Sequence, residues 1–279
     1  MQRTLVKLFR FIPLPVFYGL TACVIPFYML LDRRGYKASY RFFRQRLGRS
    51  AFRSFCNVYA NEFRMGQVVM DRFALYAGRR FELLSDDEAL FSELETARPG
   101  FVQVSCHAGN YEMAGYSLKV EHKRMYVLVY DGETETVMRQ RSALFSRSNI
   151  EMVPVSEDMS HLFILNSALL EGGIVSMPGD RIFGSQKSIS CDFFGAPARF
   201  PAGPFLLAAQ RSAPMLAVFV MKEGMRRYRI VMQRIDEGID RSLPARRQAE
   251  RMAAAFAACT ERVVRRWPTQ WFNFYDFWK

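Results

Sequence analysis

The stretch Phe101-Val-Gln-Val-Ser-Cys-His-Ala-Gly-Asn-Tyr-Glu112 joins a strand-forming run to a polar turn and the start of a helix. The run predicts a buried strand that ends at His107, and Gly109-Asn110 is typical of a turn. Positions five apart on a regular helix lie about 140° from each other, so His107 and Glu112 would not share a helix face. With the histidine on the strand end and a helix beginning near Asn110, the Glu112 carboxylate can fold back onto the imidazole. That arrangement suits a general base held in one tautomer by a carboxylate.

Apolar runs and helical patterns alternate along the rest of the chain. Strand-forming runs lie at residues 125–130, 150–155, 174–178, 215–221 and 228–235. Helical patterns lie at residues 53–78, 85–98, 133–147, 158–171 and 243–266. The second of these helices opens with a capping-box spacing at Ser85-Asp-Asp-Glu88, and residues 193–205 predict a loop that leads into a short helix. We therefore expect one α/β domain whose largely parallel central sheet is flanked by helices.

The N-terminal part combines an uncharged run with a basic flank. Residues 11–31 carry no charged side chain and meet the criterion of about 18 apolar residues for a membrane span, although three prolines argue against a straight helix. Eight basic residues follow, opposed only by Asp32: Arg33, Arg34, Lys37, Arg41, Arg44, Arg46, Arg49 and Arg53. Such a cluster resists translocation and binds anionic headgroups.

We therefore expect an N-terminal hydrophobic membrane-anchoring helix, with the body of the protein on the cytoplasmic side. The expected division is an anchor or interfacial segment with its basic flank at residues 1–53 and one folded domain at residues 54–279. A buried core helix and a signal peptide are the alternatives for the apolar run.

The composition of the chain indicates which classes of molecule the protein could bind. The net charge of +12 at pH 7 and the 25 phenylalanines suit an anionic membrane surface, an acidic protein or a phosphorylated substrate. Nucleic acid is not expected, because the aromatic residues lie in apolar runs rather than between the basic residues. The five cysteines have no CxxC spacing, which indicates reduced thiols, and three histidines make a metal centre unexpected. The chain has no GxGxxG or Walker A loop for a nucleotide.

Polar residues follow two of the predicted strands. His107 and Asp180-Arg181 would both lie at the carboxyl ends of strands, where α/β sheets build their sites. A base, a carboxylate and an arginine that binds an anionic group suit transfer of an acyl or phosphoryl group to a hydroxyl. A structural histidine and a turn-capping aspartate are the alternatives. Ser105 and Cys106 offer a covalent route, but Cys106 would face away from His107 and no Gly-x-Ser-x-Gly elbow surrounds the serine.

Several segments together resemble one protein family. His107-Ala-Gly-Asn-Tyr-Glu112 is similar to the His-x4-Glu motif of the lipid A biosynthesis (lauroyl/myristoyl) acyltransferase family. That family is a branch of the lysophospholipid/glycerolipid acyltransferases, whose wider motif is His-x4-Asp or Glu. Further matching segments are Met177-Pro-Gly-Asp-Arg181, Phe193-Phe-Gly-Ala-Pro-Ala198, Pro201-Ala-Gly-Pro-Phe205, Ala213-Pro214 and Pro268-Thr-Gln-Trp271. With the N-terminal apolar run, the resemblance covers nearly the whole chain.

The resemblance implies a membrane-associated acyltransferase with a glycerolipid acyltransferase-like fold, whose acyltransferase domain would be residues 54–279. A fatty acyl chain would pass from an acyl thioester, typically on acyl carrier protein or otherwise coenzyme A, to a hydroxyl or amine of a membrane lipid, a lipid A precursor or a related lipid. His107 would deprotonate the acceptor, and Glu112 would orient and charge-balance the imidazole. No metal or other cofactor is implied. Substrate binding is implied for Gly109, Asn110, Asp180, Arg181 and Gly203.

The same resemblance implies the cytoplasmic face of the inner membrane of a Gram-negative bacterium, and it leaves the acceptor open. Arg181 stands where the lipid A enzymes commonly have Gln, and Tyr111 replaces their usual Trp. The aromatic tail after Gln270 is similar to relatives that acylate aryl polyene or aminolipid intermediates. A non-catalytic lipid- or carrier-binding relative and a thioester hydrolase are the competing functions. The tail is expected either to pack on the core or to lie in the membrane interface.

Overall fold

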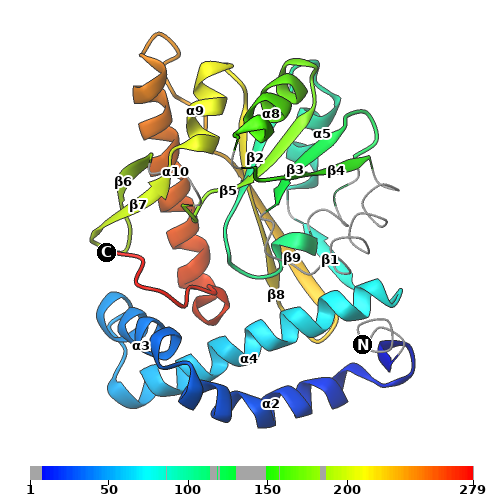
Figure 1. The fold of residues 1–279 in the computed structure, drawn as a ribbon, viewed down its shortest axis with the longest axis vertical. Coiled ribbons are helices and arrows are strands. Elements are labelled where there is room, and N and C mark those ends of the chain that lie inside the picture. The colour runs from blue at the N-terminus through cyan, green and yellow to red at the C-terminus, as the bar shows by residue number, and fades with distance from the viewer. Residues whose placement is uncertain are drawn as a thin grey trace.

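The computed structural model in Figure 1 describes residues 8–85, 87–113, 118, 120–129, 149–156, 158–182 and 187–278. Its helices are α2 (Leu14–Leu31), α3 (Arg33–Arg41), the π-helical η1 (Phe42–Arg46), α4 (Ala51–Tyr76), α5 (Glu88–Thr96), α8 (Ser160–Leu170), α9 (Gly203–Gln210), α10 (Ala245–Arg266) and the 3-10 turn η3 (Pro268–Gln270). Its strands are β1 (Glu82–Ser85), β2 (Phe101–Ser105), β3 (Met125–Val129), β4 (Ile150–Pro154), β5 (Ile174–Pro178), β6 (Ser188–Asp192), β7 (Pro197–Pro201), β8 (Met215–Lys222) and β9 (Arg227–Arg234).

One central sheet contains seven strands in the order β1-β9-β8-β2-β5-β3-β4. The neighbouring strands are parallel, except that β8 and β9 are antiparallel. Strand β2 lies between β5 and β8, with Val102 opposite both Val175 and Met215. The expected α/β fold with a largely parallel sheet is confirmed, and the carboxyl ends of β2 and β5 lie side by side.

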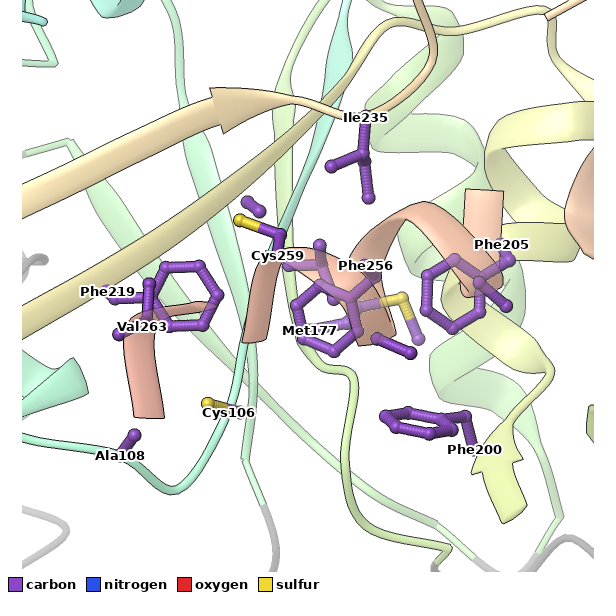
Figure 2. Close-up of a cluster of buried hydrophobic side chains, with 14 of the residues drawn as sticks. Cys106, Ala108, Met177, Phe200, Phe205, Phe219, Ile235, Phe256, Cys259 and Val263 are labelled. Carbon is purple, nitrogen blue, oxygen red and sulfur yellow. The ribbon is translucent and has the colours of Figure 1, made fainter. Parts of the chain in front are cut away.

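Alternate residues of the central strands enter two hydrophobic cores on opposite faces of the sheet. On β8, Met215, Ala217 and Phe219 pack with residues of α8, α9 and α10, whereas the intervening residues pack with α5. This period of two is the one expected for a strand buried on both faces. Figure 2 shows Phe256 of α10 inside the first core, where its ring centroid lies 5.8 Å from that of Phe205 and 6.2 Å from that of Phe219.

The apolar N-terminal run forms α2, which lies along α4 on the side of α4 away from the sheet (Figure 1). Among the described residues, α2 is the one helix long and apolar enough to cross a membrane. Leu14, Phe17 and Ile25 are buried, so one side of the helix is packed against the protein. A stripe on another side is at least half exposed, and it consists of Val16, Leu20, Val24, Phe27 and Leu31. The expected division after residue 53 falls inside the first turn of α4.

A buried polar cluster fastens α2 to the sheet. Asp71 of α4 and Lys222 of β8 are fully buried, and Lys222 Nζ lies 2.6 Å from Asp71 Oδ2. The hydroxyls of Tyr18 on α2 and Tyr228 on β9 also donate to Asp71. Burial raises the pKa of Asp71 and lowers that of Lys222, so these hydrogen bonds are what compensate for enclosing the two groups.

Three local predictions differ from the structure or lie outside it. Ser85 belongs to β1, where it pairs with Ile230, so α5 begins at Glu88 without the expected capping box. The loop expected at residues 193–205 contains β7, which pairs with β6 in a two-stranded antiparallel sheet, because its glycine and prolines occupy the turn and a sheet edge. The helix expected at residues 133–147 lies outside the described residues.

Candidate active site

His107 lies just beyond the carboxyl end of β2, in the middle of the sheet. Its side chain is 26% exposed, whereas Cys106 before it and Ala108 after it are buried. The histidine is therefore the accessible residue of a turn whose neighbours anchor it in the core. The sequence predicts a functional side chain at this position.

Asp180 holds the imidazole. Its Oδ1 lies 2.8 Å from His107 Nδ1, and its Oδ2 accepts a 2.8 Å hydrogen bond from the His107 backbone N–H. The aspartate follows β5, the parallel neighbour of β2, and the Gly179 N–H donates to the Ser105 carbonyl across the two strand ends. A Cβ at Gly179 would collide with Val104 and Phe256, so the residue before the aspartate has to be glycine. The expected convergence of His107 and Asp180 is confirmed.

The contact sets the chemistry of the ring. Asp180 is 2% exposed, and burial by itself would raise its pKa; the His107 ring, its hydrogen bonds and Arg181 outweigh burial, so the pKa of Asp180 is lowered. An ionised carboxylate only accepts hydrogen bonds, so Nδ1 of a neutral His107 carries the proton. Nε2 then keeps its lone pair, which is what a general base requires.

Glu112 has different partners from those we expected. Its Oε1 lies 2.9 Å from Arg72 Nη1, and its Oε2 accepts a 3.1 Å hydrogen bond from the Tyr76 hydroxyl, both on α4. Residues 111–113 are helical and turn this carboxylate toward α4. The carboxylate that contacts the imidazole at Nδ1 is thus Asp180, whereas the contact expected between Glu112 and the imidazole is replaced by contacts with α4. The catalytic roles of both residues remain predictions.

Glu112 is connected to His107 through a chain of side-chain contacts that runs over Arg72 and Tyr111. The Arg72 guanidinium carbon lies 5.1 Å from the centroid of the Tyr111 ring. The Tyr111 ring in turn packs edge-on against the His107 ring, with centroids 5.3 Å apart. Arg72 Nε also donates to Asn110 Oδ1 at 3.3 Å. Glu112 therefore fixes the arginine that supports one side of the His107 loop.

Gly109 and Asn110, both expected to bind substrate, hold the loop in place. Gly109 has φ +62° and lies so close to the Val220 carbonyl that a Cβ would collide with it. Its N–H donates to Gln270 O at 2.8 Å, and the Asn110 N–H donates to Val220 O at 2.7 Å. Asn110 is fully buried. These contacts indicate that both residues shape the turn, and the Asn110 side chain is enclosed rather than presented to a substrate.

Arg181, which follows Asp180 in the chain, contacts the C-terminal tail, and Gly203 lies at the start of α9. Arg181 Nη2 donates to Phe272 O at 2.9 Å, and its guanidinium carbon lies 4.7 Å from the centroid of the Tyr275 ring. Gly203 is the first residue of α9, where a Cβ would meet Met177 Cε at 3.9 Å. Asp180, for which substrate binding was also expected, is buried and contacts His107, and its substrate contact remains a prediction. Substrate contacts of Arg181 and Gly203 remain predictions.

The C-terminal tail supports the histidine turn, a role that sequence analysis missed. The Phe272 N–H donates to His107 O at 2.8 Å, and Ala108 forms an isolated antiparallel bridge with Trp271. The Asn61 amide of α4 donates to the Trp271 carbonyl at 3.0 Å. Trp271 is 3% exposed, so of the two expectations for the aromatic tail, packing on the core is the one confirmed at this residue. The signal in the sequence was the aromatic run itself.

The thiol next to the histidine is enclosed. Cys106 is 2% exposed and lies in the hydrophobic cluster of Figure 2, near Ala108 and Phe219. Burial, together with the nearby Asp180 charge, raises the pKa of this thiol well above its ordinary value. A nucleophilic thiolate is therefore disfavoured at this position. Among the described residues, no three His, Cys, Asp or Glu side chains gather to hold a metal ion.

Comparison with known sequences shows that the chain matches a protein family. The family model described as bacterial lipid A biosynthesis acyltransferase matches residues 44–279. The chain is 27% identical over 126 residues to a phosphatidylinositol mannoside acyltransferase of Mycobacterium tuberculosis, and 25% identical over 177 residues to one of Mycolicibacterium smegmatis. These matches cover 45% and 63% of this chain, and the chain spans about half the length of these relatives, at 40% and 56%.

Among solved structures, the 1-acyl-sn-glycerophosphate acyltransferase PlsC of Thermotoga maritima aligns with 97% of this chain and 99% of its own. The TM-score is 0.40 at 12% sequence identity, a likeness too low to support an argument about fold or function. The family match and the two curated relatives therefore provide the external comparison for the His107 site.

Proposed function

The chain belongs to the bacterial lipid A biosynthesis acyltransferase family, and on that premise we propose that it transfers a fatty acyl group from an acyl thioester to a hydroxyl or amine of a membrane lipid. The observation that carries this proposal is the partly exposed His107 ring, bound at Nδ1 by the buried Asp180 at the carboxyl ends of two neighbouring parallel strands. The family match supports the reaction class, and the contact supports the role of the residue.

In the proposed reaction, His107 Nε2 accepts the proton of the acceptor hydroxyl as its oxygen attacks the thioester carbonyl. The resulting tetrahedral intermediate collapses, the carbon–sulfur bond breaks, and the imidazolium returns the proton to the departing thiolate. Before the reaction, Asp180 holds the ring proton on Nδ1, so that Nε2 is unprotonated. Between attack on the carbonyl and departure of the thiol, Asp180 stabilises the imidazolium. Glu112 fixes the loop through Arg72 and Tyr111. The attack is direct, since the neighbouring thiol is buried.

We further propose that the protein works at the cytoplasmic face of a bacterial inner membrane, with α2 as an interfacial helix. The exposed apolar stripe of α2 would enter the lipid, and the exposed basic residues of α3 that follow it would meet anionic headgroups. The packing of the other side of α2 onto α4 supports an in-plane helix over a separate span. The net charge of +12 suits acyl carrier protein, an acidic donor, with coenzyme A as the alternative thioester.

The test is thiol release by the purified full chain in mixed micelles, with acyl carrier protein or coenzyme A thioesters and a membrane lipid extract. We expect release that depends on added lipid and falls by about 10²–10⁴-fold in His107→Ala. His122→Ala is the matched control, because His122 also binds a buried carboxylate, Glu95, but lies before β3 at the amino end of the sheet. That control should keep its rate.

Other outcomes would identify a different function. Thiol release without lipid would point to a thioester hydrolase. Binding of acyl carrier protein without turnover, unchanged in His107→Ala, would point to a non-catalytic relative. An active His107→Ala variant would remove the proposed mechanism.

A further inference from the structure

A polar cavity lies between the basic N-terminal segment and the C-terminal tail, which meet in space although they are far apart in the sequence. Figure 1 shows α3 beside the last residues of the chain. The cavity has a volume of about 300 Å³. Its lining includes Arg41 of α3, Gln45 and Arg46 of η1, and Tyr275, Asp276 and Trp278 of the tail.

The cavity is lined by guanidinium groups that are open to solvent or held by weak contacts. The Arg41 side chain is 55% exposed, and its Nη1 lies 3.4 Å from Asp276 Oδ2. The Arg46 guanidinium carbon lies 4.6 Å above the ring of Trp278, a stacking contact that leaves its N–H edge able to donate. An ion pair between partly exposed groups contributes little, so an incoming anion can replace Asp276 at Arg41. Two planar guanidinium groups are the side chains best matched to phosphate oxygens.

The cavity shares a wall with the His107 site. Tyr275 lines the cavity, and its hydroxyl donates to the backbone carbonyl of Asp180 at 3.3 Å. Its ring also lies against Arg181, whose guanidinium carbon is 4.7 Å from the ring centroid. A group bound in the cavity is therefore separated from the residues under the imidazole by one aromatic side chain.

We propose that this cavity is a subsite for a phosphate ester group carried by one of the substrates. The proposal rests on the proposed acyl transfer and deepens it, since it adds a phosphate requirement that the His107–Asp180 contact does not specify. The phosphate belongs either to the headgroup of the acceptor lipid or to the phosphopantetheine arm of the thioester donor. Both sources present unesterified phosphate oxygens to Arg41 and Arg46, with one negative charge on a phosphodiester and up to two on a phosphomonoester.

Direct binding tests the subsite without any turnover. The full chain in zwitterionic micelles would carry 5-fluorotryptophan at its three tryptophans, with the Trp278 resonance assigned from Trp278→Phe. We expect glycerol 3-phosphate or 4′-phosphopantetheine to shift the Trp278 signal saturably, and the ligand that binds tighter identifies the source. Inorganic phosphate is the reference for the shared group.

Two substitutions that should change the binding affinity in opposite directions test the subsite most directly. Arg41→Gln should weaken binding by about 10-fold, while Asp276→Asn should tighten it several-fold by removing the competing carboxylate. Arg34→Gln, which removes one exposed charge from α3 outside the lining, should bind like the parent. A shift that does not saturate with any probe, or Arg41→Gln and Asp276→Asn variants that change in the same direction, would overturn the subsite.

Kinetics separate this subsite from the proposed reaction. In an active enzyme, Arg41→Gln should raise KM for the phosphate-bearing substrate about 10-fold and leave kcat within twofold. A fall in kcat with unchanged KM would contradict a binding role. If no thioester is turned over but the Trp278 titrations behave as expected, the acyl-transfer proposal fails and the phosphate subsite stands.

Discussion

Two histidines in this chain contact a buried carboxylate in the same way, at opposite edges of the sheet. Asp180 accepts from both the backbone N–H and Nδ1 of His107, and Glu95 accepts from the same two groups of His122. Burial by itself would raise the pKa of either carboxyl. At Asp180 the His107 ring, its hydrogen bonds and the Arg181 charge together outweigh burial, so the pKa is lowered. At Glu95 hydrogen bonds from His122, Lys123 and Glu121 together outweigh burial, and the pKa is lowered there too.

The surroundings of the two pairs differ. His107 follows β2 at the carboxyl edge, where a second strand end delivers Asp180 and the tail covers the turn. His122 precedes β3 at the amino edge, its side chain is 63% exposed, and Glu95 also accepts from the N–H groups of Glu121 and Lys123. The comparison teaches that a histidine–carboxylate contact is not by itself a site. Glu95 secures a loop, while Asp180 orients a ring at the edge where parallel strands converge.

The largest expected difference between the pairs is catalytic. Asp180→Asn should lower the rate of acyl transfer by about 10³–10⁴-fold, because an amide presented to Nδ1 no longer enforces the tautomer with a free Nε2. Glu95→Gln, the matched change at the other pair, should leave the rate within about twofold. Initial rates of lipid-dependent thiol release measure both. Equal losses in the two variants would show that the pairs do not differ in function.

At the His122–Glu95 pair the expected effect is smaller, and it falls on stability rather than on activity. Glu95→Ala should lower the free energy of unfolding by about 1–3 kcal/mol, because three backbone N–H groups lose their acceptor. The folded fraction should keep its activity. Urea unfolding in micelles, followed by circular dichroism, gives the free energy. Glu93→Ala, an exposed position on the same helix, is the control and should change it by less than about 0.5 kcal/mol.

The position of the His107–Asp180 pair follows largely from the sequence. His107 and Asp180 both come directly after runs that had to be buried strands, and the carboxyl ends of parallel strands share one edge, so their convergence was predictable. Which carboxylate contacts the His107 ring was not predictable from the sequence. Glu112 is close in the chain, but the helical turn at residues 111–113 aims it at Arg72 on α4. That choice depends on how α4 packs, which no local pattern encodes.

The support from the tail was hidden for a similar reason. The aromatic residues after Gln270 indicated burial or membrane contact, but their backbone partners at His107 and Gly109 depend on contacts between segments more than 150 positions apart in the chain. The hairpin of β6 and β7 was missed because its prolines and glycine are typical of loops, and a two-stranded sheet tolerates them at its edges.

The central proposal is that Asp180, and not Glu112, orients the imidazole of His107 as the proposed general base, and the tautomer of His107 tests it most directly. Nitrogen-15 NMR of histidine-labelled protein reports which ring nitrogen carries the proton, and the variant His107→Ala assigns the resonance among the three histidines. We predict a proton on Nδ1 that persists in Glu112→Gln and is lost in Asp180→Asn. A tautomer that is unchanged in Asp180→Asn but altered in Glu112→Gln would contradict the account.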